Sequence, residues 1–164
     1  MASKTKKSTK SKSKNKITVR PLVASDLEAV IAIDEAIVGR VRRGFFERRL
    51  RAATKNPKNF IYVGAEHDGA LKGFAFVRLL TGEFGGDHTV AVLDAIGVDP
   101  KTQSHGFGSA LMAHVDEVMK AKNITDMHTQ TTTPHSNMLR FLEGIGFVPA
   151  PRLVLARDVG ALNA

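Results

Sequence analysis

Residues 90–111, VAVLDAIGVDPKTQSHGFGSAL, decide the fold of this chain. The apolar run from Val90 to Val98, which only Asp94 and Gly97 interrupt, predicts a buried strand. The Asp99-Pro100 step then predicts a turn, and an apolar-periodic helix follows it to about residue 122. The stretch therefore predicts a strand, a glycine-bearing loop and a helix in direct succession.

Two glycines, Gly106 and Gly108, fall where this helix should begin. The first amide groups of a helix have no partner inside it and lie at its positive dipole end, which is a suitable place for phosphate. A P-loop would need a Lys and then Ser or Thr after the second glycine, and a dinucleotide fingerprint would need a third glycine. Ser109 and Ala110 follow instead, so neither motif is present.

The spacing of Gln103, Gly106 and Gly108 resembles the acyl-CoA-binding motif of the GNAT acetyltransferases. That family carries Gln or Arg, two residues, Gly, one residue, and Gly or Ala between its fourth strand and the next helix. A Gly-x-Gly step alone would also suit a structural turn. A second similar feature is the Gly146-Phe147 step after a short helix, and the resemblance covers residues 17–158.

The resemblance implies a mixed α/β (α+β) fold. Its central sheet should be mostly antiparallel, with six or seven strands and about four flanking helices, and it should splay between the fourth and fifth strands. The pattern predicts strands at 17–22, 60–65, 71–80, 90–98 and 125–133, helices at 45–53 and 135–143, a first helix from a Ser25–Glu28 capping box to Gly39, and a turn at Gly144–Phe147 into Leu153–Ala156.

The length and composition restrict the class of protein. A chain of 164 residues favours one folded domain, here residues 17–164. The absence of Cys excludes disulfides, thiolate metal sites and a cysteine nucleophile, and the six His residues have no metal-ligand spacing, so no metal is expected. No apolar run is long enough to span a membrane, so we expect a cytoplasmic protein with no membrane partner.

The net charge of +8 belongs to the N-terminus. Residues 1–16 hold seven Lys and no acid, and the remainder has 17 basic against 16 acidic residues. A Lys-rich segment with almost no apolar residues is expected to be a disordered tail. It is either a solubilising extension or a weak polyanion-binding segment, and no nucleic-acid partner is expected beyond such non-specific contact.

The cofactor that the resemblance implies is acetyl-CoA. Its amide-rich pantetheine arm would pair with the backbone of the fourth strand, and its pyrophosphate would lie on the amides of the loop. The expected cofactor-binding residues are Ile96, Gly97, Val98, Gln103, Ser104, His105, Gly106, Phe107, Gly108, Ser109, Asn137 and Phe141.

The catalytic candidates are Asp94 and His128. Asp94 lies two residues before Ile96, so its side chain should share a face with Ile96 near the thioester and serve as a base or an ammonium-binding group. The alternative is an acid that bonds to a neighbouring strand or loop. His128 would act through a water molecule from the facing strand, or would be a neutral His beside Thr129.

The sequence departs from the family at residues 134–141. Many members place Asn, two residues, Ala, three residues and Tyr here, and the Tyr protonates the departing thiolate. In this chain Pro134, Asn137 and Phe141 occupy those places, and Phe141 cannot donate a proton. Either water, Ser136 or His135 assists the thiolate, or the protein binds acyl-CoA without efficient catalysis.

The leading hypothesis is therefore an acetyl-CoA-dependent N-acetyltransferase of the GNAT type that acts on a primary amine of a small molecule or a protein. The alternative is a catalytically weak, regulatory acyl-CoA-binding module. The resemblance also allows a homodimer. Six arginines within residues 40–51 form either a solvated helix face or a positive wall for an acidic acceptor or CoA phosphates.

Overall fold

A computed structural model describes residues 16–82, 85–131 and 136–158. The predicted Lys-rich tail, apart from Lys16, lies outside the described residues. The chain forms two compact units, Met1–Gln130 and Thr131–Ala164.

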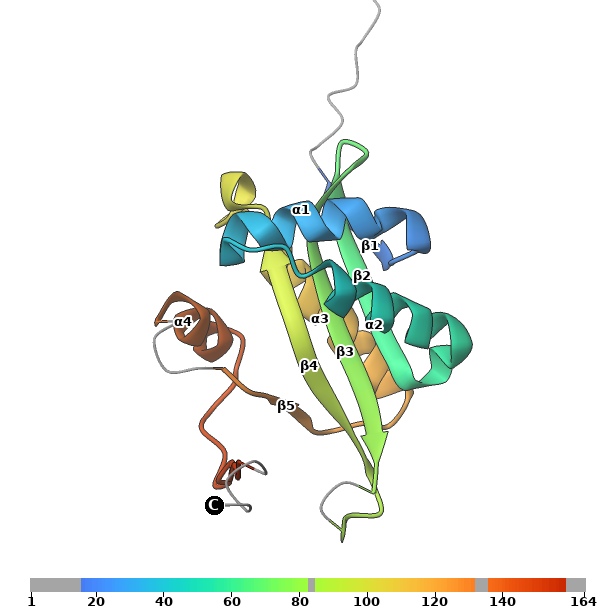
Figure 1. The fold of residues 1–164 in the computed structure, drawn as a ribbon, viewed down its shortest axis with the longest axis vertical. Helices are drawn as coiled ribbons and strands as arrows, with labels where there is room; N and C mark the ends of the chain where they lie inside the picture. Colours follow the sequence, from blue (N-terminus) through green and yellow to red (C-terminus); the bar gives the residue numbers. More distant parts are fainter. Residues whose placement is uncertain (1–15, 83–84, 132–135, 159–164) are drawn as a thin grey trace, which may run out of the picture. The chain divides into compact units, whose positions relative to one another are not determined.

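The first unit is built on a five-stranded sheet with the strand order β1-β2-β3-β4-β5 (Figure 1). Neighbouring strands are antiparallel except β4 and β5, which are parallel. The strands are β1 Thr18–Pro21, β2 Phe60–His67, β3 Ala70–Thr81, β4 Thr89–Val98 and β5 Met127–Thr129. The mixed, mostly antiparallel sheet is confirmed.

The prediction of six or seven strands is wrong for the described residues, which contain five. The predicted strand at 125–133 is reduced to β5, and residues 151–158 are exposed and form no strand. An apolar run becomes a strand only where another strand accepts its peptide hydrogen bonds. Among the described residues, Leu153–Ala156 has no such partner.

The described residues contain four α-helices, as predicted: α1 Leu27–Val38, α2 Arg43–Lys55 and α3 Phe107–Ala121 in the first unit, and α4 Ser136–Gly144 in the second. In the first unit α1 and α2 cover one face of the sheet and α3 covers the other (Figure 1). After α4, Gly146 adopts φ 96° and the Phe147 amide donates to the Leu142 carbonyl at 3.0 Å, which closes the predicted turn.

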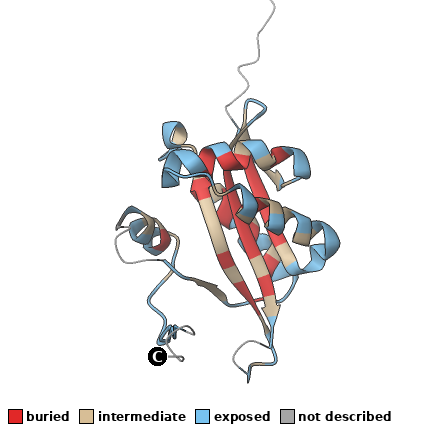
Figure 2. Cartoon of the chain, in the orientation of Figure 1, coloured by how far each residue is buried: buried red, intermediate tan, exposed pale blue. Residues whose placement is uncertain are grey.

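Aromatic rings fill the space between α1, α2 and the sheet. Phe46 of α2 contacts Phe74 and Phe76 of β3 edge to face, with centroids 5.5 and 5.3 Å apart, and all three are fully buried. On the other face, Leu111 and Val115 of α3 are fully buried. Figure 2 shows the buried residues concentrated along the central strands, so this sheet is the core of the first unit.

A β-bulge interrupts the pairing of β3 and β4. Phe76 pairs with Ala95 and Val77 pairs with Leu93, so Asp94 is the extra residue of β4. A bulge changes the alternation of side chains along a strand. Asp94 contacts Arg49 of α2, so its side chain lies on the face of the sheet that α1 and α2 cover. Gly97 faces α1 on that same side, and its neighbour Ile96 therefore points to the opposite face, which α3 covers. The prediction that Asp94 and Ile96 share a face is wrong.

The start of α1 also differs from the predicted capping box. Ser25 lies inside a 3-10 turn, Ala24–Asp26, and Asp26 instead accepts a hydrogen bond from the Val23 amide at 2.8 Å. Arg20 of β1 donates to both oxygens of Asp26 and holds the pKa of this carboxyl below its usual value. Asp26 was missed because its main partner comes from another element of the fold.

A buried ion pair fixes α2 against α1. Asp34 of α1 is 3% exposed and accepts a hydrogen bond from Arg42 Nε at 2.8 Å. The Arg42 guanidinium also lies over the Phe45 and Phe46 rings, 5.3 and 5.6 Å from their centroids. The pair therefore positions the first turn of α2.

We predict that Asp34→Asn lowers the free energy of unfolding by about 3 kcal/mol, because it leaves a half-buried guanidinium without its carboxylate. Glu28→Gln is the matched control: it breaks the exposed pair of Glu28 with Arg43 and should leave the stability nearly unchanged. Urea unfolding of the three proteins measures both values. Equal losses in the two variants would contradict the assignment.

Candidate active site

The loop between β4 and α3 is tied to the sheet by its backbone. Its first residue, Asp99, donates its amide to the Lys72 carbonyl of β3 at 2.8 Å. The Asp99 side chain accepts the Lys101 amide at 3.0 Å and caps the short turn Pro100–Thr102. The loop therefore enters α3 from a fixed starting point.

The N-terminus of α3 has the geometry of an anion cradle. Gly106 is the N-cap, adopts the left-handed φ of 86°, and receives no side-chain capping hydrogen bond. The first helical bond runs from the Ala110 amide to the Gly106 carbonyl at 2.9 Å. The amides from Gly106 to Ser109 therefore have no acceptor within the helix. Gly106 and Ser109 are exposed, so an anion can reach this end of the dipole.

Two predicted ligand side chains also form hydrogen bonds with backbone carbonyls of β4 and of the loop. Gln103 Nε2 donates to the Val98 carbonyl at 3.4 Å, and His105 Nδ1 lies 2.8 Å from the Gln103 carbonyl. This second contact requires a proton on Nδ1, because a carbonyl oxygen can only accept a hydrogen bond. Ser104 adopts φ 65°, a left-handed backbone conformation that residues other than glycine rarely adopt. The hydrogen bonds of the Gln103 and His105 side chains help to hold the loop in this conformation.

The edge of β4 beyond the bulge is unpaired on the β5 side in the described part of the first unit. β5 pairs only with Ala91–Leu93, and β4 continues to Val98. This is the predicted splay. Ile96 and Val98 lie in this open half of β4 and carry peptide groups that an amide-rich ligand could pair with.

Gly97, a predicted cofactor contact, has a packing role. A Cβ atom here would lie 2.8 Å from the Phe74 ring and 3.0 Å from Ile37 Cδ1. Only glycine at this position of β4 leaves room for the Phe74 ring of β3 and for Ile37 of α1. Its contact with a cofactor remains a prediction.

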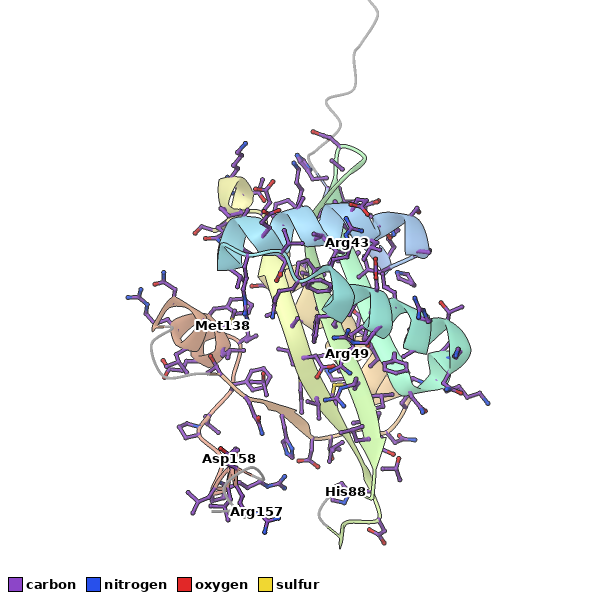
Figure 3. The ribbon with its side chains drawn as sticks, in the orientation of Figure 1. Arg43, Arg49, His88, Met138, Arg157 and Asp158 are labelled. Atoms are coloured by element: carbon purple, nitrogen blue, oxygen red, sulfur yellow. The ribbon has the colours of Figure 1, made fainter. Side chains whose placement is uncertain are left out.

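Asp94 lies in an ionic cluster that the sequence did not predict. Its carboxylate accepts a hydrogen bond from Arg78 Nε at 2.6 Å, and Arg49 Nη2 is 3.2 Å from the same oxygen, Oδ2. The side chain of Asp94 is 7% exposed. Figure 3 shows Arg49 reaching from α2 over the sheet. Arg78 could have been found as the one charged residue in the second half of β3, where Phe74–Leu80 is otherwise apolar.

Tyr62 of β2 lies on the same face of the sheet, because it pairs with Phe76 of β3 and their ring centroids are 4.3 Å apart. The residue is 7% exposed, and its hydroxyl has no hydrogen-bond partner among the described residues. Burial raises the pKa of Tyr62 above its ordinary value. The hydroxyl therefore stays protonated at neutral pH.

His128 lies on β5 opposite Val92, which in turn pairs with Arg78 of β3. Paired residues point to the same face, so His128 shares the face of Arg78 and Asp94. Its neighbour Thr129 donates a hydrogen bond to the Leu93 carbonyl at 3.0 Å. The structure thus brings the two catalytic candidates to one face, and their roles remain predictions.

The arginines of residues 40–51 divide into two groups. Arg42, Arg43 and Arg49 form ion pairs with acids of α1, α2 and β4. Arg40, Arg48 and Arg51 are exposed, as expected for a solvated surface. Half of the predicted positive wall is therefore neutralised by the fold.

Asn137 and Phe141 lie on α4, in the second unit. The side-chain oxygen of Asn137 accepts a hydrogen bond from Arg140, and Phe141 is half-buried. Their predicted contact with the cofactor remains a prediction. Pro134 and His135 lie outside the described residues.

No group of three or more His, Asp or Glu side chains within the described residues is arranged to hold a metal ion. Within the same residues, no helix has the length and apolar character that crossing a membrane requires.

Comparison with protein families places residues 28–147 in the Acetyltransferase (GNAT) family. This match covers most of the chain, so the chain belongs to the GNAT family and the resemblance seen in its sequence is confirmed. No curated protein matches the sequence.

Solved structures share the fold at low sequence identity. The aminoglycoside N-acetyltransferase AAC(6')-Iy in complex with CoA is 18% identical with a TM-score of 0.73, over 91% of this chain and 99% of that one. A ribosomal-protein-alanine N-acetyltransferase from Brucella melitensis biovar Abortus 2308 is 15% identical with a TM-score of 0.69, over 87% and 99%. A transcriptional regulator from Bacillus halodurans C-125 is 20% identical with a TM-score of 0.71, over 87% and 99%.

Proposed function

We propose that this protein is an acetyl-CoA-dependent N-acetyltransferase that acetylates a primary amine. The observation that carries the proposal is the uncapped N-terminus of α3 at Gly106, beside the unpaired end of β4. It supplies a strand edge for a pantetheine arm and, a few residues later in the chain, amide donors for a pyrophosphate. Membership of the family and the CoA complex of a structural neighbour support the same cofactor.

The residues present fit CoA. A side chain at Gly106 would strain the left-handed backbone that shapes the exposed cradle. The amides from Gly106 to Ser109 would hold the pyrophosphate, and the peptide groups of Ile96 and Val98 would hold the pantetheine arm. When bound, acetyl-CoA supplies an activated acetyl group as a thioester.

The transfer requires a neutral amine. An alkyl ammonium has a pKa of about 10, so it must lose a proton before its nitrogen attacks the carbonyl carbon. The new C–N bond forms as the C–S bond breaks, and the sulfur leaves with the electron pair. We assign the ammonium to Asp94, and the proton passes either to Asp94 or, through water, to His128.

The leaving thiolate needs little assistance, because a simple thiol has a pKa of about 8.5. Phe141 cannot protonate it, and the chain's single tyrosine is the buried Tyr62. Water serves instead. Phe141 also favours the second candidate function, a catalytically weak module that binds acyl-CoA and regulates a partner. The transcriptional regulator from Bacillus halodurans C-125 that shares the fold supports the same candidate.

We predict that acetyl-CoA at 100 times its dissociation constant stabilises the protein by about 2.7 kcal/mol in thermal melts. Gly106→Ala should lose most of this gain, because the substitution disturbs the cradle. Gly39→Ala is the matched control, because Gly39 has a left-handed φ of 75° at the end of α1. This substitution should lower the stability without ligand by roughly 1–2 kcal/mol, as Gly106→Ala should, but it should leave the stabilisation by acetyl-CoA intact. A parent protein that acetyl-CoA does not stabilise would contradict the proposal.

We predict that Asp94→Asn lowers turnover by about 100- to 10,000-fold with nearly constant affinity for acetyl-CoA, if Asp94 removes the proton. An acceptor screen that follows free CoA release identifies the amine for this assay. His128→Ala is the comparison, and a larger loss there would assign the base to His128. Near-parental turnover in both variants would exclude both groups as the base, and CoA binding without turnover on any amine would favour the regulatory module.

A further inference from the structure

An acid and a base lie side by side on the face of the sheet that carries α2. Arg49 Nη2 and Asp94 Oδ2 are 3.2 Å apart, and their side chains are 27% and 7% exposed. The two groups come from different elements, so the pair is a feature of the fold. An anion and a cation held at this spacing complement a ligand that carries the opposite charges at a similar spacing.

Arg49 is held in place by contacts that leave most of its donors available. Its guanidinium lies over the Phe45 ring, 5.2 Å from the centroid. Among the described residues Asp94 is its ionic partner, and no hydrogen bond from the guanidinium to any other acceptor is present there. A planar guanidinium has five N–H donors in a fork that matches a carboxylate. Arg49 is thus a preorganised carboxylate-binding group.

Asp94 has an equivalent free position. Both arginine contacts fall on Oδ2, and Oδ1 accepts no hydrogen bond in the part of the chain that the structure describes. An ammonium group is a natural partner for that oxygen.

The Tyr62 hydroxyl is a further polar group on the same face of the sheet, since Tyr62 packs against Phe76 of β3, two residues before Arg78. It is buried and has no hydrogen-bond partner among the described residues. Buried hydroxyl groups are nearly always hydrogen-bonded, so an orphan one is a sign of a missing polar partner.

We propose that the acceptor is an α-amino acid or a compound with the same head group, in which a carboxylate lies next to the reactive amine. Arg49 binds the carboxylate and Asp94 binds the ammonium before its proton is lost. The inference rests on the proposed function, since it names the acceptor class of that same site.

The charge of the surrounding helices favours this acceptor over a polycation. Residues 27–55, which span α1 and α2, carry seven basic and four acidic side chains. A positive surface repels an acceptor with several ammonium groups and attracts one with a carboxylate. The acceptor class therefore differs from that of the aminoglycoside acetyltransferases that share the fold.

The test compares CoA release with the common L-amino acids and with the corresponding amino acid amides, which keep the amine and lose the carboxylate charge. We expect kcat/KM for the best acid to exceed that of its amide by about 10- to 100-fold, mainly through KM. Arg49→Gln should bring kcat/KM for the acid and for its amide close to equal, whatever the common change in rate that the loss of its contact with Asp94 causes. Arg51→Gln, an exposed arginine of the same helix, is the control and should keep the preference.

Stabilisation by acetyl-CoA shows that each variant is folded. Equal rates with acids and amides in the parent protein, or an intact preference in Arg49→Gln, would overturn the inference. CoA release with spermidine or kanamycin but with no amino acid would overturn it and leave the proposed function standing. If none of the amines supports CoA release, both the proposed function and the inference are overturned.

Discussion

The unsatisfied amide groups at the start of α3 are the constraint on which the site depends. A helix leaves its first amides without helical acceptors, and a side chain usually caps them. Here the N-cap is Gly106, which contributes no side chain and places the chain in the left-handed region with φ 86°. The loop before it is tied to β3 through Asp99. The sheet therefore holds the uncapped start of α3 next to the open end of β4.

The second constraint is the bulge at Asp94. Without the extra residue, Asp94 would alternate with Ala95 and face α3 together with Ile96. With it, the carboxylate lies on the α2 face with Arg78 and Arg49, on the same side as His128. One extra residue thus places Asp94 and Ile96 on opposite faces of the sheet, and in the proposed mechanism these faces serve the acceptor and the cofactor.

The features that the sequence predicted are those encoded locally. The strand, loop and helix of residues 90–111 follow from apolar periodicity and glycine spacing. The bulge could not be predicted, because it depends on pairing with β3. The Arg49–Asp94 pair also joins residues far apart in the sequence, and Arg49 looked like any other arginine of a basic helix.

The most direct test of the central claim is an NMR titration of isotopically labelled protein that follows the backbone amides of residues 104–109. CoA carries the pyrophosphate, and pantetheine has the same arm without it. The account predicts that CoA shifts these amide resonances strongly, whereas pantetheine shifts resonances of β4 and leaves those of the loop in place. Loop amides that do not respond to saturating CoA, or that respond equally to pantetheine, would contradict the account.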